Sequence, residues 1–246
     1  MPFSTNISNP SKSKLAAIQA AREQAKPEQA LTKWINPAEA TERLRIVFDD
    51  SISMSSEIDN AREGVVEFLR NCLANQTSVS VNFLNTQNEA LASLNSNLIQ
   101  VADNIKSVKL SMSGTSLFGT MMRVLDLKPA LTRMIVFTDG SPTDRLAEYK
   151  HESSQLDNWL RSADIVISKA KERSAPIDTV FFGSAHGNDD EIALLKYLAE
   201  RTSGYFLHFD PAKVSFRTAL KYLAPVNRLM LASESVRKEI ESGKRS

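Results

Sequence analysis

The middle of this chain alternates between short apolar runs and longer stretches in which apolar residues recur every three or four positions. Short apolar runs bounded by polar residues are typical of buried strands, and the longer spacing is typical of amphipathic helices. The short runs predict strands at 44–48, 78–84, 134–140, 177–183 and 204–209. A weaker alternation predicts another strand at 107–111.

The stretches between these runs predict helices. Ile58, Ala61, Val65, Leu69 and Cys72 share one helical face, and further helices are expected at 116–125, 154–172, 190–201 and from Pro211 to about 223. Strands that are apolar on both faces and alternate with helices indicate a mainly parallel sheet covered on both sides. The sequence therefore predicts an α/β fold with a Rossmann-like arrangement.

The two ends of the chain differ from its middle. Residues 1–40 contain good helix formers but only a thin apolar stripe, and Pro27 and Pro37 interrupt any long helix. We expect an extension that is partly helical or mobile. Residues 226–246 are polar and predict a helical tail that fades into disorder. The predicted domain spans residues 41–225.

Composition limits the class of protein. With 30 basic and 29 acidic residues, the net charge of +1 does not provide the broad positive field that non-specific nucleic-acid binding needs. No apolar run is long enough for a membrane span, and the polar N-terminus does not resemble a secretory signal. Cys72 is the only cysteine, which favours a reducing compartment. We therefore expect a cytoplasmic protein that binds neither nucleic acid nor membrane.

Carboxylates and hydroxyls gather where predicted strands end. The first strand is followed by Asp49, Ser51 and Ser53, the loop before the 116–125 helix carries Thr115, and the third strand leads into Asp139. In open parallel sheets, ligand sites form at the carboxyl ends of the strands. Oxygen ligands without histidine or cysteine suit a hard divalent cation such as Mg²⁺, Mn²⁺ or Ca²⁺. The sequence thus predicts a metal site formed by these five residues.

The predicted site leaves the ion electrophilic. Asp49 and Asp139 balance its charge, and the hydroxyl ligands add none. Gly114 and Gly140 flank two of the ligands, where a tight backbone costs little. An Asp or Glu from a protein partner is then a natural sixth ligand.

The segments FDDSISMS, SGTS and VFTDGSP resemble the metal-ion-dependent adhesion site of von Willebrand factor A (vWA) domains. The resemblance covers roughly residues 44–225 and implies a vWA fold in which the five residues named above hold the ion directly or through water. It also implies a non-enzymatic module that binds protein partners. Intracellular members of the family often work beside AAA+ ATPases or in multi-protein assemblies.

This chain departs from the family pattern at two positions. Ile52 stands where many members have glycine, so the loop is expected to be less open. Asp50 adds a second carboxylate beside Asp49. Asp50 is interpreted either as a favourable charge near the start of the following helix or as a further, water-bridged ligand.

The sequence leaves two other functions open. One is a Mg²⁺-dependent phosphoryl-transfer enzyme, although the chain has no Gly-rich loop with a Lys-Ser/Thr pair and no clear acid/base partner for an aspartyl nucleophile. The other is a structural assembly subunit in which the metal is incidental. Asp189, Asp190 and Glu191 are expected to cap a helix, His186 to face solvent, and His208 to pack on the sheet.

Overall fold

The computed structural model describes residues 42–56, 58–73, 77–86, 101, 105–106, 109–183, 188–210, 212–215 and 220. Within this part of the chain a five-stranded sheet has the order β2-β1-β3-β4-β5, and every neighbouring pair of strands is parallel. The strands are β1 (Glu42–Phe48), β2 (Thr77–Phe83), β3 (Arg133–Thr138), β4 (Ile177–Phe182) and β5 (Phe206–Phe209). The predicted α/β fold is confirmed, and the five main strands lie within one or two residues of their predicted ends.

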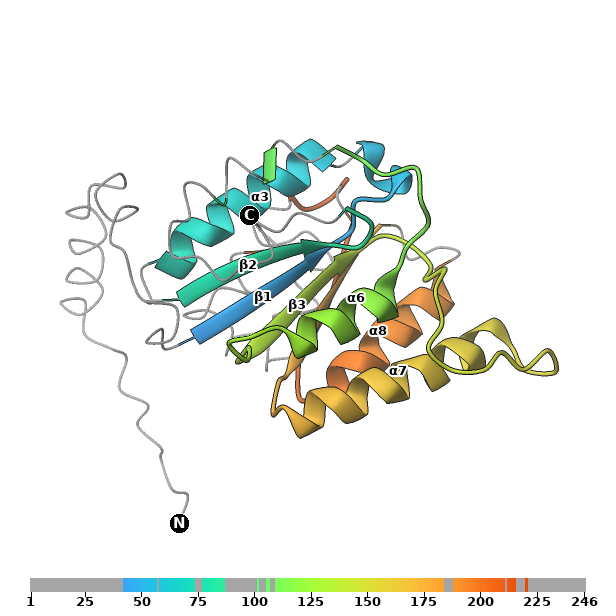
Figure 1. Ribbon diagram of the computed structural model, residues 1–246. Helices are drawn as coiled ribbons and strands as arrows, with labels where there is room; N and C mark the ends of the chain where they lie inside the picture. Colours follow the sequence, from blue (N-terminus) through green and yellow to red (C-terminus); the bar gives the residue numbers. More distant parts are fainter. Residues whose placement is uncertain are drawn as a thin grey trace, which may run out of the picture.

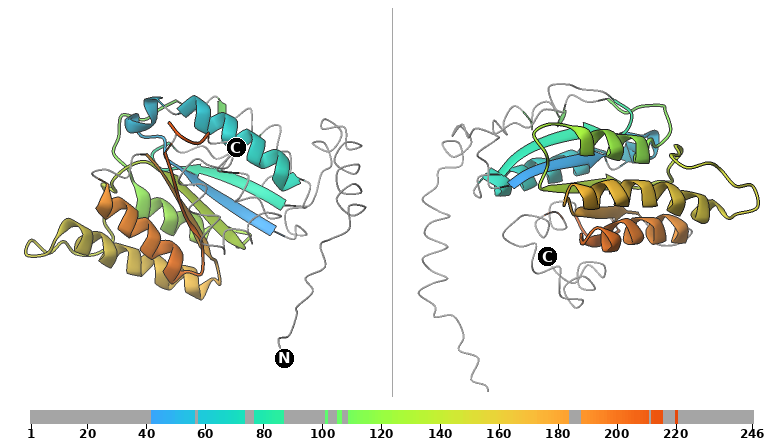
Figure 2. Two further views of the ribbon diagram at one scale, coloured as in Figure 1. Left: turned by 180° about the vertical axis from the view of Figure 1, so that it is seen from behind. Right: turned by 60° about the horizontal axis from the view of Figure 1, so that its bottom comes forward.

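Helices cover both faces of the sheet (Figures 1 and 2). Helix α3 (Ile58–Leu73) lies on one face, and α6 (Leu117–Asp126), α7 (Gln155–Glu172) and α8 (Asp189–Arg201) lie on the other. A short 3-10 helix, η1 (Ile52–Ser56), connects β1 to α3.

Alternate residues of each central strand enter different halves of the core. Leu44, Ile46 and Phe48 of β1 pack on the α3 side, whereas Val47 packs against the layer formed by α6, α7 and α8. All four side chains are at most 1% exposed. Burial on both faces explains why residues 46–48 of β1 are all apolar, and the one charged side chain among the buried positions of β1, Arg45, is held by hydrogen bonds to Ser80 and to the carbonyls of Lys128 and Pro129.

The direction of winding reverses around β1. From β1 the chain passes over the α3 face to β2 at the edge of the sheet, and then crosses back over the α6 face to β3 on the other side of β1. The connection after β1 leads to β2 on one side, and the connection after β3 leads to β4 on the other side. In sheets of this type, ligands bind at the carboxyl ends of the two strands where the direction changes in this way. The ends of β1 and β3 are therefore the candidate location for a ligand site.

Two sequence-based predictions of secondary structure need correction. Lys109 and Leu110 are not in a strand, and Ser111 forms only an isolated bridge with Ser51. Residues 212–215 form a turn and a bend instead of the first turn of a helix, since Lys213 N and Val214 N both donate to Asp210 O. The predicted terminal segments 1–40 and 226–246 lie outside the described residues.

Candidate metal centre

Asp49 and Asp139 occupy equivalent places at the ends of neighbouring strands. Asp49 follows β1 and Asp139 follows β3, and the two strands are paired in parallel up to Phe48 and Phe137. The Asp49 amide donates to Phe137 O at 2.9 Å, so the backbones are still paired where the first carboxylate emerges. The sheet thereby holds both acids at the carboxyl ends of β1 and β3, where the direction of winding reverses.

The 3-10 turn η1 presents the two serines. Met54 N donates to Ser51 O at 3.1 Å, and the Met54 side chain is fully buried in the α3 half of the core, which anchors the turn. Ile52 is 48% exposed, so it stands outside the site instead of filling it. The loop was expected to be less open because of Ile52, and the structure shows that the turn directs this side chain to solvent.

Hydrogen bonds connect four of the five predicted ligands. Asp49 Oδ1 accepts from Ser51 N at 2.9 Å, and the Ser51 and Ser53 hydroxyl oxygens lie 2.8 Å apart. Ser53 Oγ donates to Asp139 Oδ1 at 2.9 Å. Because the single Ser53 hydroxyl hydrogen is used for Asp139, Ser51 Oγ is the donor in the pair of serines. The chain of contacts thus runs from η1 to the end of β3.

Thr115 approaches the same group from a third segment. A Cβ placed on Gly140 would lie 3.8 Å from both Ser53 Oγ and Thr115 Oγ1, so the two hydroxyls flank the Gly140 backbone. Leu117 N and Thr143 N both donate to Thr115 O, which fixes this residue at the start of α6. Within the described residues the Thr115 hydroxyl has no hydrogen-bond partner. Of the five predicted ligands, Thr115 has the fewest contacts with the others.

Burial makes the two acids unusually basic. Burial, reinforced by the charge of Asp49, raises the pKa of Asp139 to about 6, although the hydrogen bond from Ser53 opposes the shift. Burial also raises the pKa of Asp49 against the hydrogen bonds from Ser51 and Thr138. In the part of the chain that the structure describes, neither acid forms an ion pair with Lys, Arg or His. A cation at this position would remove an unfavourable concentration of negative charge.

The oxygen separations suit a small ion. Mg²⁺–O bonds of about 2.0–2.1 Å in an octahedron place neighbouring ligand oxygens about 2.9 Å apart. The Ser51–Ser53 and Ser53–Asp139 oxygen pairs are 2.8 and 2.9 Å apart. Separations of this size are typical of hydrogen bonds when no ion is present. They also match the distance between neighbouring oxygen ligands of octahedral Mg²⁺, so the donor set fits the ion with little rearrangement.

Thr138 is a supporting residue that motif matching did not single out. Its hydroxyl donates to Asp49 Oδ2 at 2.6 Å, and the side chain is fully buried. Since Ser51 N occupies the other oxygen, both oxygens of Asp49 are oriented by the protein. The only sequence signal was its position beside Asp139 in the TDG segment.

Two further acids support the surrounding loops. Glu191, in the first turn of α8, accepts a short hydrogen bond from Ser141 Oγ, two residues after Asp139. Asp144 accepts from Phe118 N at 3.2 Å and Gly119 N at 2.6 Å, which satisfies the amino end of α6. Contacts of this kind depend on the packing of helices against the sheet, so sequence spacing could not reveal them.

Asp50 has a role that neither sequence-based interpretation anticipated. Its Oδ1 accepts from Asn85 N at 2.9 Å, and its Oδ2 accepts from Thr86 N at 3.0 Å and from the Thr86 hydroxyl. The residue is 1% exposed. Asp50 therefore joins the end of β1 to the loop after β2, and it does not cap the following helix.

The remaining candidates are structural where they are described. Asp189, Asp190 and Glu191 occupy the first turn of α8, where acids are favourable, but the N-cap is Asn188 and no side chain forms a capping hydrogen bond there. The His208 ring packs against Phe181 and forms a 3.0 Å hydrogen bond with Gly183 O. Its expected packing on the sheet is confirmed. His186 lies outside the described residues.

No protein-family model matches the chain, and no curated protein sequence matches it. Solved structures do match. The vWF domain of the type V pili tip protein Mfa5 from Porphyromonas gingivalis aligns with a TM-score of 0.56 at 12% identity, over 77% of this chain and 95% of that one. This chain has a vWA fold.

Two further structures share this vWA fold. An aerotolerance-related membrane protein from Bacteroides fragilis aligns with a TM-score of 0.53 at 14% identity, over 78% of this chain and 98% of that one. The pilus adhesin SpaC from Lactobacillus rhamnosus GG aligns with a TM-score of 0.55 at 15% identity, over 78% of this chain and 30% of the adhesin. This chain therefore spans less than a third of that adhesin. At these identities the likeness concerns the fold alone.

None of the helices in the described residues has the length and apolar character needed to cross a bilayer.

Proposed function

We propose that this vWA chain is a protein-binding module that depends on a divalent cation. In this proposal the ion is Mg²⁺, with Mn²⁺ and Ca²⁺ as alternatives, and a carboxylate of a protein partner completes its coordination. The ligands are Asp49, Ser51, Ser53, Thr115 and Asp139. The observation that carries the proposal is the hydrogen-bonded series from Ser51 through Ser53 to Asp139, whose oxygen separations match those of Mg²⁺ ligands.

The charge of the site supports an acidic partner. Two carboxylates neutralise a divalent ion, and the hydroxyl ligands leave it able to attract a further anionic oxygen. Ser53 is exposed, so a partner can reach this side of the site from solvent. We therefore propose Asp or Glu as the residue that the partner presents.

Exposed apolar side chains near the site support a protein as the partner. Among the described residues, the large hydrophobic side chains that are exposed are Ile52, Met112, Tyr149 and Ile165. Ile52 lies between two predicted ligands, and Met112 follows Ser111, whose amide donates to Asp50 O at 2.7 Å. Methionine is enriched in protein interfaces relative to the rest of the surface, so the exposed Met112 near the site favours a protein partner.

The family resemblance extends the proposal to the cellular setting. We propose a cytoplasmic protein that acts in a multi-protein assembly, with an AAA+ ATPase as a candidate partner. No catalytic role is proposed for the site, because the residues that support it position oxygen ligands and supply no evident acid/base pair.

Calorimetric titration with MgCl₂ tests the metal site. We expect the wild type to bind Mg²⁺, Asp139→Asn to lose at least about tenfold in affinity, and Asp59→Asn to bind like the wild type. Asp59 is a matched control because its side chain is 89% exposed on α3. Equal affinity of all three proteins would show that the site is assigned wrongly.

Affinity capture from the native source, with Mg²⁺ or with chelator, separates the function classes. A binding module should retain an acidic partner only when Mg²⁺ is present. The Asp139→Asn variant should not retain the partner even with Mg²⁺. A structural subunit would assemble equally well in chelator. Mg²⁺-dependent hydrolysis of a generic phosphoester, abolished by Asp49→Ala, would instead identify a phosphoryl-transfer enzyme.

A further inference from the structure

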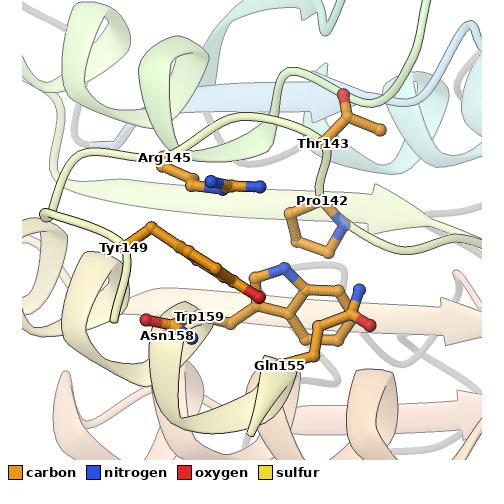
Figure 3. Close-up of a pocket in the computed structure, with 7 residues that line it drawn as sticks. All are labelled: Pro142, Thr143, Arg145, Tyr149, Gln155, Asn158 and Trp159. Atoms are coloured by element: carbon orange, nitrogen blue, oxygen red, sulfur yellow. The ribbon is translucent and has the colours of Figure 1, made fainter. Parts of the chain in front are cut away.

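A pocket of about 390 Å³ opens between the loop after β3 and the first turns of α7 (Figure 3). We refer to it as the Arg145–Trp159 pocket. It has one formal positive charge, from Arg145, and its lining contains no carboxylate. The lining residues are Pro142, Thr143, Arg145, Tyr149, Gln155, Asn158 and Trp159.

One wall of this pocket is bound to the candidate metal centre. Pro142 forms an isolated parallel bridge with Thr115, and Thr143 N donates to Thr115 O at 2.9 Å. The Thr143 side chain packs so closely on Gly114 that a Cβ placed there would lie 2.5 Å from Thr143 Oγ1. A partner that reaches the ion beside Thr115 therefore has the Arg145–Trp159 pocket next to it.

The polar groups that remain available in the pocket include two strong donors. The Arg145 guanidinium stacks on Tyr149, 4.2 Å from the ring centroid, which leaves its N–H edge free for an anion. The Trp159 indole nitrogen faces the space beneath Arg145 and Pro142 in Figure 3, and no described residue accepts its hydrogen.

Asn158 does not contribute to this donor set. Its amide accepts from Lys150 N at 2.9 Å and donates to Lys150 O and Ser154 O at 3.1 and 3.0 Å. These bonds hold the loop against α7, and the Trp159 ring is only 5% exposed. Asn158 and Trp159 are therefore fixed parts of the pocket, and Arg145 is its exposed, charged rim.

We propose that the Arg145–Trp159 pocket binds a second carboxylate of the partner whose first carboxylate reaches the ion. Guanidinium and indole groups donate hydrogen bonds and accept none, so they select an acceptor such as a carboxylate. The aromatic faces of Tyr149 and Trp159 accommodate the methylene groups of its side chain. The partner is thus a segment with two acidic residues, and this inference rests on the proposed function for the first of them.

The experiment uses synthetic peptides and the indole signal of Trp159. The chain contains two tryptophans, Trp34 and Trp159, so ¹⁵N-labelled protein gives a small set of indole resonances that Trp159→Phe assigns. Peptides with one Asp, or with two Asp separated by a series of Gly-Ser spacers, are titrated with Mg²⁺ and with chelator. The variants are Arg145→Gln and, as a control, Arg201→Gln, since Arg201 also stacks on a tyrosine, Tyr197, but ends α8.

We expect the two-Asp peptide with one particular spacer length to shift the Trp159 indole resonance. In Mg²⁺ this peptide should bind about tenfold more tightly than the one-Asp peptide. Arg145→Gln should remove this advantage and Arg201→Gln should keep it. If Mg²⁺-dependent binding is the same for all peptides and the Trp159 resonance stays in place, the pocket assignment is overturned while the proposed function stands. If two-Asp peptides move the resonance without any dependence on Mg²⁺, the pocket assignment stands and the proposed function fails.

Discussion

The Ser53 hydroxyl donates a 2.9 Å hydrogen bond to the Asp139 carboxylate, which lies 86 positions later in the sequence. The bond joins the turn after β1 to the end of β3, and it directs two of the proposed ligands toward each other. Ligands that are already oriented lose little conformational freedom when an ion binds. The proposed metal site is therefore largely preformed.

Ser53→Ala should weaken Mg²⁺ binding by about tenfold, because it removes one ligand and releases Asp139. The free energy of unfolding in chelator should fall by less than about 1 kcal/mol, since Ser53 is exposed. Calorimetry and urea denaturation measure the two quantities. Ser55→Ala is the control, because Ser55 is an exposed serine of the same turn. A loss of affinity in Ser55→Ala as large as that in Ser53→Ala would contradict the assignment.

Mg²⁺ affinity should depend on pH through Asp139, whose pKa burial and Asp49 raise to about 6. The ion requires the ionised carboxylate, so below that pKa protons compete with Mg²⁺ for Asp139. The Mg²⁺ affinity should then decrease by up to about tenfold for each pH unit. Above about pH 7 the affinity should level off. Titration calorimetry across this range measures the effect. A constant affinity from about pH 7.5 to pH 5 would argue against Asp139 as a ligand.

Asp139→Asn should stabilise the protein in chelator near pH 7.5, by about 1–2 kcal/mol. Because the folded-state pKa of about 6 lies above the unfolded value of 3.8, the folded state binds more protons between these values. Its stability therefore falls as pH rises through this window. The variant removes that cost and keeps a carbonyl acceptor for Ser53. Chemical denaturation should show the gain for Asp139→Asn and none for the exposed control Asp59→Asn.

Added Mg²⁺ should reverse this order of stability. Binding to the folded wild type raises its free energy of unfolding by mass action, whereas Asp139→Asn binds the ion poorly. Thermal denaturation with and without Mg²⁺ measures this difference. An equal rise in melting temperature for both proteins would mean that the ion binds elsewhere.

Asp50→Ala should destabilise the fold by about 2–4 kcal/mol and leave Mg²⁺ binding to the folded fraction nearly unchanged. The change removes the acceptor of Asn85 N, Thr86 N and the Thr86 hydroxyl. Urea denaturation measures the loss, and calorimetry under folding conditions measures the affinity. Asp50→Asn retains one acceptor oxygen and should lose less stability. A large loss of affinity with normal stability would instead support the water-bridged ligand interpretation.

The sequence by itself determined the main strands and the helices between them. Strands such as Arg133–Thr138 are apolar on both faces because they lie between two helical layers, so their runs are visible without coordinates. The five oxygen-bearing residues were also found from sequence, since each lies just after a strand or just before a helix. Their proposed role as metal ligands remains a prediction.

Only the tertiary structure decided which groups meet those residues. Asp50 contacts the loop after β2, Glu191 contacts Ser141, and Asp144 caps α6, because the strand order and helix packing bring these distant segments together. The Arg145–Trp159 pocket arises in the same way. Hydrophobic periodicity reports the local burial of each segment, whereas such contacts depend on how complete elements are arranged in space, which no local pattern encodes.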